Sequence, residues 1–306
     1  MNEPMVSVII PAYRAAGTIG RAIDSLLTQT RPPDEIVVVD DGSPDDLSTA
    51  LESYGDRVVL ARKPNGGAAS ARNHGIELAR GELLAFLDAD DYWEPDKLER
   101  QLRVFADHSE VGLCAGRFFT QQPGQDTRTL WAAENERFYD RILTTSGSAV
   151  LDVMLEIWTT TVVVRREALG TNRFVSGLEP AEDRDLWIRL IASSPVYLTS
   201  APLATWVFEP GSLSRTNIDR DCSNMMRVLQ RHRSLLDHNG LRRWESYVFR
   251  RWAANHLGDG RPQAAFRPAW QRLCRQPTSL EAWWILLKCS TLSARASRSA
   301  RLASHA

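Results

Sequence analysis

The sequence lacks the features of several common protein classes. Its four cysteines are scattered along 306 residues without a C-x-x-C pair, which argues against a zinc site and against a disulfide framework. No apolar run approaches the ~20 residues that span a bilayer, and the segment before Val6 has no basic region typical of a signal peptide. We therefore expect a cytoplasmic protein that is neither exported nor membrane-spanning.

Two nucleotide-binding motifs are also missing. The first apolar run, Val6–Ile10, continues into Pro11–Gly17 without the G-x-G-x-x-G turn that binds a dinucleotide, and no Walker loop occurs. The composition itself is ordinary for a globular protein, with 43% hydrophobic and 25% charged residues. A dehydrogenase is thus disfavoured, whereas a sizeable folded core is expected.

The N-terminal third of the chain alternates between apolar, β-branched runs and helical patterns. Such alternation predicts right-handed crossovers and an α/β fold with a mainly parallel central sheet flanked by helices. In such sheets, ligands bind beyond the carboxyl ends of the strands. Three polar strand ends should therefore converge on one crevice, namely Pro11–Tyr13, Asp40–Asp41 and Asp88–Asp91.

The most informative strand end follows the apolar run Leu83–Leu87. Three carboxylates, Asp88, Asp90 and Asp91, occur there within four positions, and charges beside a buried strand are costly unless a cation meets them. Asp88 and Asp90 lie two apart, so an extended chain directs both to one side, where they could share Mg²⁺ or Mn²⁺. The alternative is a salt-bridged turn or a cap for the helix that Pro95 opens, and we expect Asp91 to cap locally.

A diphosphate would complete such a metal site, because a hard cation held by two carboxylates still needs anionic ligands. The bound ion would then neutralise a departing nucleoside diphosphate. Paired carboxylates also occur in glycoside hydrolases, but hydrolysis needs neither a diphosphate nor a metal. The pattern therefore favours a nucleotide-linked substrate over hydrolysis.

Five motifs together resemble family 2 glycosyltransferases of the GT-A fold, in the family's order and spacing. The matching segments are Val6–Tyr13, Val38–Ser43, Ala71–Ile76, Phe86–Asp91 and Glu182–Trp187. The resemblance extends over roughly residues 5–215. It implies a GT-A nucleotide-diphospho-sugar transferase domain, which we place at residues 1–218, followed by a C-terminal helical region at residues 219–306.

The resemblance implies a nucleotide site at the first two strand ends. Pro11, Ala12 and Tyr13 match the strand end that lines the base and the ribose. Asp41 matches the aspartate that recognises the base, usually uracil, so that UDP is the expected carrier. Tyr13 could otherwise be an ordinary core aromatic.

The resemblance places two further motifs at the sugar donor. Arg72 and Asn73 match an Ala-Arg-Asn motif that borders the donor pocket, although they could instead pin the loop Gly66–Gly67. Asp88 and Asp90 match the D-x-D motif, in which the first aspartate faces the ribose and the last binds the metal. The implied cofactor is Mn²⁺ or Mg²⁺, and the implied donor is a nucleotide-diphosphate sugar.

An acidic pair further along the chain matches the family residues that act on the acceptor. Transfer requires a base, because the acceptor hydroxyl must lose its proton as it attacks the anomeric carbon opposite the leaving diphosphate. Asp183 matches the aspartate that acts as this general base in inverting members of the family. Glu182 beside it either orients the acceptor or favours the start of a helix electrostatically.

One segment departs from the family pattern. Many relatives carry a histidine before Pro-Gly-Ser near the end of the domain, where this chain has Glu209. Glu209 could replace a metal or diphosphate contact, or leave that contact absent. The Gln-x-x-Arg-Trp motif of processive synthases is also missing, so we expect transfer of a single sugar to a glycan or lipid-linked acceptor.

Charge is distributed unevenly along the chain. The formal net charge is −1, yet residues 220–306 contain 16 Lys and Arg against 5 Asp and Glu. We place the domain boundary at residue 219 because the composition there becomes helical, Arg-rich and Trp-containing. The segment Trp283–Lys288 and the arginines after it suit peripheral contact with a membrane surface; alternatively, its tryptophans pack the helical region onto the first domain.

We therefore predict a metal-dependent, inverting sugar transferase with a nucleotide-sugar donor and no nucleic-acid partner. The alternative is a nucleotide-sugar-binding protein without catalysis, whose helical region mediates interactions. Sugar turnover in the presence of acceptors distinguishes the two, because a binding protein would hold the donor without transferring the sugar.

Overall fold

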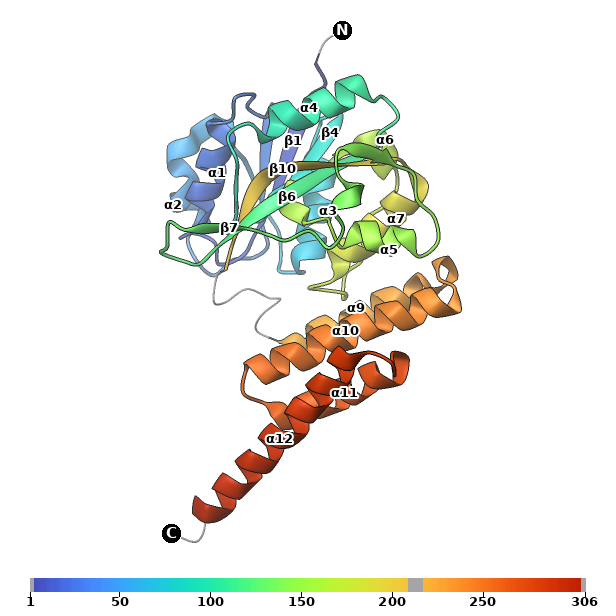
Figure 1. Ribbon diagram of the computed structural model, residues 1–306. Helices are drawn as coiled ribbons and strands as arrows, with labels where there is room; N and C mark the ends of the chain where they lie inside the picture. Colours follow the sequence, from blue (N-terminus) through green and yellow to red (C-terminus); the bar gives the residue numbers. More distant parts are fainter. Residues whose placement is uncertain (1–2, 209–216, 304–306) are drawn as a thin grey trace. The chain divides into compact units, whose positions relative to one another are not determined.

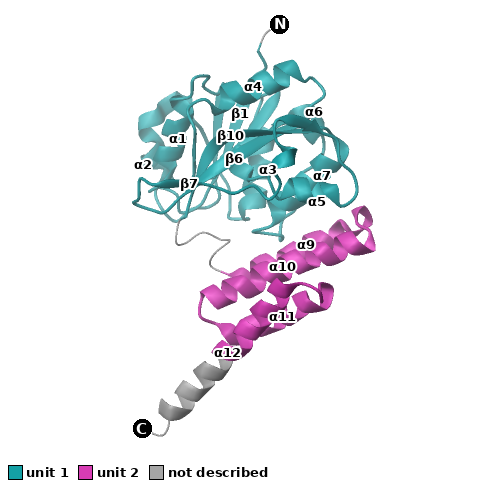
Figure 2. Cartoon of the chain, in the orientation of Figure 1, with its two compact units in different colours: residues 1–212 teal, residues 213–306 magenta. Residues whose placement is uncertain are grey.

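The computed structural model describes residues 3–208 and 217–303, with the side chains of the last helix described as far as residue 292 (Figure 1). The chain forms two compact units, Met1–Ser212 and Leu213–Ala306 (Figure 2). The boundary at residues 218 and 219 stays a prediction from composition. Among the described residues, no helix combines the length and apolarity that a membrane crossing requires.

The first unit alternates strands and helices. Its strands are β1 (Val6–Ala12), β2 (Glu35–Asp40), β3 (Val59–Arg62), β4 (Leu83–Phe86), β5 (Tyr92–Trp93), β6 (Leu113–Gln121), β7 (Arg128–Leu130), β8 (Arg141–Leu143), β9 (Val163–Arg165) and β10 (Val196–Val207). Its α-helices are α1 (Ile19–Leu27), α2 (Leu47–Leu51), α3 (Ala68–Leu78), α4 (Lys97–Asp107), α5 (Ala149–Met154), α6 (Arg166–Leu169) and α7 (Glu182–Ser193). Its 3₁₀ helices are η1 (Glu52–Arg57), η2 (Glu136–Phe138) and η3 (Thr159–Thr161).

Ten strands of the described chain form one sheet, in the order β3-β2-β1-β4-β9-β6-β10-β5, with β7 beside β6 and β8 beside β10. The first four strands pair in parallel, as the strand–helix alternation predicts. Beyond β4 the sheet is mixed, because β9 is antiparallel to both of its neighbours whereas β6 and β10 are parallel. The carboxyl ends of β1, β2 and β4 therefore lie at one edge.

The helix α3 packs closely against β1 through small side chains. A Cβ atom added at Gly75 would lie only 2.4 Å from Ile9 Cγ2, so this contact requires glycine. Ala69 and Ala71 on the same helix are also buried. This close packing places Arg72, in the first half of α3, beside the edge where β1 and β4 end.

Two β-rich segments form other elements than their sequence patterns favour. The β-branched residues of Thr159–Arg165 favour one strand, but the segment begins with η3 and becomes strand β9 only at Val163. The threonine hydroxyls there form side-chain hydrogen bonds that compete with a strand ladder, such as Thr161 Oγ1 to Trp158 O at 2.7 Å. The patterns of Val196–Leu198 and Leu203–Phe208 each favour a short strand, whereas the structure has the single strand β10 (Val196–Val207). Register shifts around Pro202 accommodate the proline within this strand.

The second unit is helical. It contains α9 (Ile218–Arg231), η4 (Arg233–Leu235), α10 (His238–Gly258), α11 (Pro262–Arg275) and α12 (Leu280–Ala303). The helices α10, α11 and α12 share a small apolar core. The core residues are Ala253, Ala265, Ala269, Leu273, Ala282, Ile285, Leu286 and Cys289.

Candidate active site

The guanidinium of Arg72 joins the two acidic motifs of the first unit. Its Nη2 donates to Asp88 Oδ1 at 2.6 Å, and its Nη1 donates to Glu182 Oε1 at 2.7 Å. Asp88 follows β4, whereas Glu182 begins α7, so one side chain from α3 links segments that are distant in sequence. The D-x-D motif and the Glu-Asp pair therefore belong to one site.

Electrostatics keep Arg72 charged despite its burial. Burial alone lowers the pKa of Arg72, but the carboxylates of Asp88, Glu182 and Asp183 raise it above its ordinary value. For Glu182, burial raises the pKa to about 7, and the neighbouring charge of Asp183 adds to this effect while Arg72 opposes it. Glu182 Oε2 is buried and makes no hydrogen bond with the described residues. The site thus combines a permanent cation with an acid that titrates near neutrality.

Asp183 is held by neighbours on two elements. Thr159 Oγ1 from η3 donates to Asp183 Oδ2 at 2.8 Å, and the backbone N–H of Arg184 donates to Asp183 Oδ1 at 2.7 Å. Trp187 Nε1 in turn donates to Thr159 Oγ1 at 3.0 Å and fixes the direction of that hydroxyl. Glu182 beside it is buried, whereas Asp183 itself is partly exposed. Its geometry suits a proton acceptor.

The three carboxylates after β4 have separate environments. Asp88 is partly exposed and bound by Arg72, not placed as a cap of α4. Asp91 is buried and accepts hydrogen bonds from Thr160 Oγ1 at 2.6 Å and from the Val207 backbone N–H at 3.0 Å. The expected local capping role of Asp91 is wrong, because its side chain connects η3 to β10. Burial raises the pKa of Asp91 well above its usual range, and the charges of Asp90 and Asp88 contribute.

The donor atoms near Asp90 fit a hard divalent cation only if a substrate completes the site. Among the residues that the structure describes, no group of three His, Cys, Asp or Glu side chains is arranged to hold a metal ion. Asp88 and Asp90 are two carboxylates, and Mg²⁺ commonly binds one or two carboxylates together with substrate phosphates. These residues therefore suit a cation that arrives with a diphosphate.

The ends of β1 and β2 provide the expected nucleotide side of the site. Pro11 and Ala12 end β1, and Tyr13 follows with 48% of its surface exposed. The alternative of a core aromatic at Tyr13 is therefore wrong. Asp41 lies directly after β2 and is buried.

Asp41 pins the loop that precedes α3. Its carboxylate accepts hydrogen bonds from Lys63 Nζ at 2.6 Å and from the backbone N–H groups of Gly66 and Gly67 at 3.0 and 2.7 Å. Asn73, the alternative candidate for holding this loop, instead exchanges two hydrogen bonds of 2.9 Å with the backbone of Phe174. Asp41 and not Asn73 therefore holds the loop.

The family model "Glycosyl transferase family 2" matches residues 7–170, which is more than half of the chain. The chain belongs to glycosyl transferase family 2. The family that the sequence motifs resemble is thereby confirmed, although the Glu182–Trp187 motif lies beyond the matched residues. Glu209, the departure from the family pattern, lies outside the described residues.

The sequences of individual family members align with part of the chain. An uncharacterized glycosyltransferase of Rickettsia typhi is 33% identical over 198 residues, which are 64% of this chain and 61% of the relative. The Bacillus subtilis protein TuaG, named for teichuronic acid biosynthesis, is 36% identical over 193 residues, which are 62% of this chain and 73% of the relative. The chain therefore spans less than two thirds of the rickettsial relative's length.

Solved structures of similar proteins identify the fold. TarS of S. aureus, in complex with UDP-GlcNAc, has a TM-score of 0.61 at 18% identity, over 98% of this chain and 92% of that chain. The mannosyltransferase PcManGT of Pyrobaculum calidifontis, in complex with GDP-Man and Mn²⁺, has a TM-score of 0.63 at 19% identity, over 96% and 81%. The expected GT-A fold is confirmed, with a mixed, curled sheet and C-terminal helices.

An aromatic cluster beside the acidic motifs was not expected from the sequence. Trp158, next to Thr159, lies 4.4 Å from Trp206 between ring centroids, and its indole N–H is 3.4 Å from Asp91 Oδ2. Phe118 stacks between Trp158 and Trp131, with centroid distances of 5.5 and 5.7 Å. Trp131 is half-exposed and follows β7 directly.

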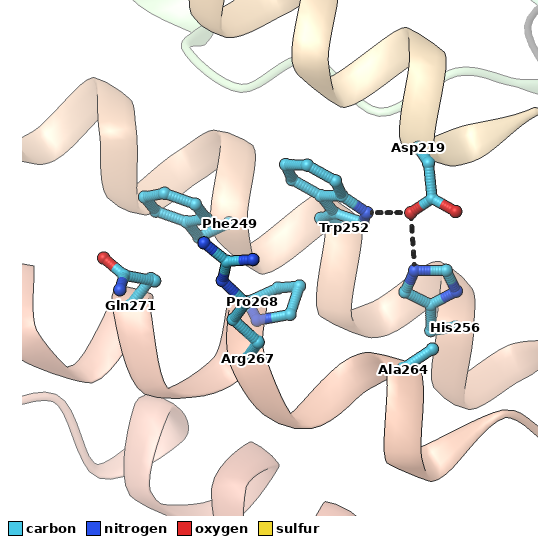
Figure 3. A pocket seen from close by; sticks show the side chains of 8 residues that line it. All are labelled: Asp219, Phe249, Trp252, His256, Ala264, Arg267, Pro268 and Gln271. Carbon is cyan, nitrogen blue, oxygen red and sulfur yellow. Dashed lines mark hydrogen bonds and ion pairs between the residues drawn. The ribbon is translucent and has the colours of Figure 1, made fainter.

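The second unit contains a separate cavity of about 480 Å³, lined by none of the predicted site residues (Figure 3). Asp219 Oδ1 accepts hydrogen bonds there from Trp252 Nε1 at 2.6 Å and from His256 Nε2 at 2.9 Å. These hydrogen bonds lower the pKa of Asp219, with that from Trp252 contributing most. Asp219 thus connects the start of α9 to two residues of α10.

Proposed function

We propose that this family member is a metal-dependent, inverting glycosyltransferase that moves one sugar from a nucleotide-diphosphate sugar to a glycan or lipid-linked acceptor. The observation that carries the proposal is the double contact of Arg72 with Asp88 and Glu182. This contact joins the motif that faces a leaving diphosphate to the motif that carries the base. A binding protein without catalysis would need only the first of these motifs.

On the donor side, Asp90 would hold Mn²⁺ or Mg²⁺ and Asp88 would face the ribose. When bound, the cation supplies Lewis-acid stabilisation to the leaving diphosphate. Pro11, Ala12 and Tyr13 line the base and ribose in this assignment. Asp41 shapes their surroundings by fixing the Gly66–Gly67 loop, as well as lying at the expected base-recognition position.

On the acceptor side, Asp183 takes the proton from the attacking hydroxyl. The acceptor oxygen forms a bond to the anomeric carbon as the bond from that carbon to the diphosphate oxygen breaks, and a single displacement inverts the anomeric centre. The support for Asp183 over Glu182 is geometric, because Asp183 is partly exposed whereas Glu182 is buried against Arg72. Glu182 thus positions Arg72, a role beside the two that its sequence position suggested.

The proposed classes of donor and acceptor are supported by the residues of the site and by similar proteins. We propose UDP as the carrier from the match at Asp41; TarS was solved with UDP-GlcNAc, whereas PcManGT was solved with GDP-Man. TuaG is named for teichuronic acid biosynthesis, which supports a glycan acceptor. The half-exposed Trp131 adds support, because sugars pack their apolar faces against aromatic rings.

The proposal is tested by donor turnover with Mn²⁺ and a panel of UDP-sugars, GDP-mannose and glycan acceptors. Asp183→Asn should lower transfer by about 10²- to 10⁴-fold and retain UDP binding. Asp90→Ala, like EDTA, should abolish the Mn²⁺-dependent part of UDP binding measured by calorimetry. Donor binding without transfer to any acceptor would favour the non-catalytic alternative, and normal turnover in Asp183→Asn would refute the base assignment.

A further inference from the structure

The helix α12 has two apolar faces, of which only one is covered. Ala282, Ile285, Leu286 and Cys289 face the core shared with α10 and α11. The outer face carries Leu280, Trp283, Trp284 and Leu287 at positions i, i+3, i+4 and i+7. Trp284 is 58% exposed and Leu287 is 63% exposed. A helix that is apolar all round is usually buried all round, so the outer face indicates a partner.

The charge around this outer face is positive. Lys288 Nζ lies 5.0 Å above the ring of Trp284, so a cation borders the exposed indole. Glu281 is the last acidic residue of the chain, and it is paired with Arg250 at 3.0 Å and Arg272 at 2.7 Å. After residue 292 the sequence adds three arginines and no acidic residue. The partner should therefore combine an apolar layer with negative charge.

The neighbouring helix α11 adds residues of the same kind. Phe266 and Trp270, one turn apart, are half-exposed, whereas Ala265 and Ala269 face the shared core. Arg267 between them is exposed. Two adjacent helices thus share an inner apolar core and carry exposed aromatic and basic side chains outside it.

We propose that the outer face of α12, formed by Leu280, Trp283, Trp284, Leu287 and Lys288, binds the surface of an anionic lipid bilayer. Tryptophan and leucine side chains insert at the boundary between headgroups and acyl chains, where amphipathic rings are favoured. Lys288 extends toward the headgroups, and the surrounding basic residues are attracted to anionic lipids. This surface would bring the enzyme to lipid-linked acceptors, yet the proposal does not depend on sugar transfer.

A second copy of the chain fits this face less well. A two-fold contact would place the same surface against itself and so bring Lys288 and the other basic residues of the helical unit together. Like charges so placed oppose association, whereas anionic headgroups neutralise them. The charge of residues 220–306, with 16 basic and 5 acidic residues, therefore favours lipid over self-association.

The test is co-sedimentation of the full chain with vesicles of phosphatidylcholine alone or with about 30% phosphatidylglycerol. The wild type should bind the anionic vesicles, and added salt should weaken binding as it screens charge. Trp284→Ser/Leu287→Ser should lower the partition coefficient at least about tenfold. Lys288→Gln should lower it about fivefold on anionic vesicles. Leu60→Ser/Leu78→Ser, which removes two exposed leucines from the first unit, serves as the matched control and should bind normally.

Absence of wild-type binding to both kinds of vesicle would overturn the proposal, and so would equal binding by Trp284→Ser/Leu287→Ser. A dimer that this double variant abolishes, without vesicle binding, would assign the face to self-association and equally overturn it. Circular dichroism verifies that the variants keep their helices. Asp183→Asn should bind vesicles normally, so failure of the transferase proposal is distinguishable from failure of membrane binding.

Discussion

Arg72 Nη1 lies 2.7 Å from Glu182 Oε1, although 110 positions separate the two residues in the sequence. The same guanidinium contacts Asp88 through its other terminal nitrogen. A planar guanidinium can satisfy two carboxylates at once, which the compact ammonium of lysine cannot do in the same geometry. Arg72 therefore links the two acidic motifs and fixes the positions of Asp88 and Glu182 relative to each other.

Arg72→Met should lower the free energy of unfolding by about 3–5 kcal/mol, because it removes two charge-assisted hydrogen bonds that a buried guanidinium makes to Asp88 and Glu182. Urea denaturation measures the loss. Arg80→Met is the matched control and should cost less than about 1 kcal/mol, because the Arg80 side chain is exposed and lies 3.8 Å from Glu35. Equal losses in both variants would show that burial of the Arg72 contacts contributes nothing to stability.

Thr159→Val should reduce the rate of transfer about tenfold while the KM for the donor stays unchanged. The hydroxyl of Thr159 orients Asp183 Oδ2, and valine retains the shape of the side chain without the donor. Thr159→Ser keeps the hydroxyl and should restore most of the rate. A low rate in both variants would mean that packing of the methyl group, not the hydrogen bond, is what matters.

Stability should decrease as pH rises from about 4.5 to about 7, and Glu182 should be one cause. Burial raises the pKa of Glu182 from 4.5 in the unfolded chain to about 7 in the folded one. The folded state therefore binds more protons in this window, which stabilises it at the acidic end. Glu182→Gln should flatten this part of the stability curve in urea denaturation between about pH 5 and about pH 7.5. Asp183→Asn should shift the window to lower pH, because it removes a negative charge beside Glu182.

Much of the site could be predicted from the order of elements along the chain. Asp88 and Asp90 follow a buried strand, and the parallel arrangement of β1, β2 and β4 brings their carboxyl ends together. That Arg72 bridges Asp88 and Glu182 could not be predicted, because this contact depends on how closely α3 packs against β1. That closeness comes from Gly75, whose importance is invisible until its neighbour Ile9 is known.

The residues that hold the carboxylates of the site in place were harder to predict than the carboxylates themselves. Thr159 and Thr160 have high β propensity, so the pattern indicated a strand, yet their hydroxyls bind Asp183 and Asp91. The aromatic cluster is equally hidden, since Phe118, Trp131 and Trp206 come from distant segments. Sequence patterns report on local periodicity, whereas these groups meet only through tertiary packing.

Gly75→Ala should destabilise the first unit by about 1–3 kcal/mol, because the added methyl group would overlap the side chain of Ile9. The displacement of α3 should also weaken transfer by moving Arg72. Gly258→Ala is the matched control: it lies at the end of α10 with no atom within 4 Å of the added Cβ. Alanine there should leave stability unchanged or increase it by up to about 1 kcal/mol. Thermal unfolding monitored by circular dichroism compares the two, and destabilisation by both would indicate a general intolerance of alanine.

Trp131→Ala should raise the KM for a glycan acceptor about two- to tenfold, the range expected for loss of one aromatic stacking partner. The indole of Trp131 is half-exposed and stacks on Phe118, so its outer face is open to a sugar ring. The KM for the donor and the requirement for Mn²⁺ should not change, because the proposed donor residues lie at the ends of β1, β2 and β4, whereas Trp131 follows β7. Trp131→Phe should recover part of the affinity. Trp270→Ala, which removes a similarly exposed tryptophan from α11, should leave the KM for a water-soluble acceptor unchanged. If both alanine variants raise that KM equally, Trp131 does not form an acceptor subsite.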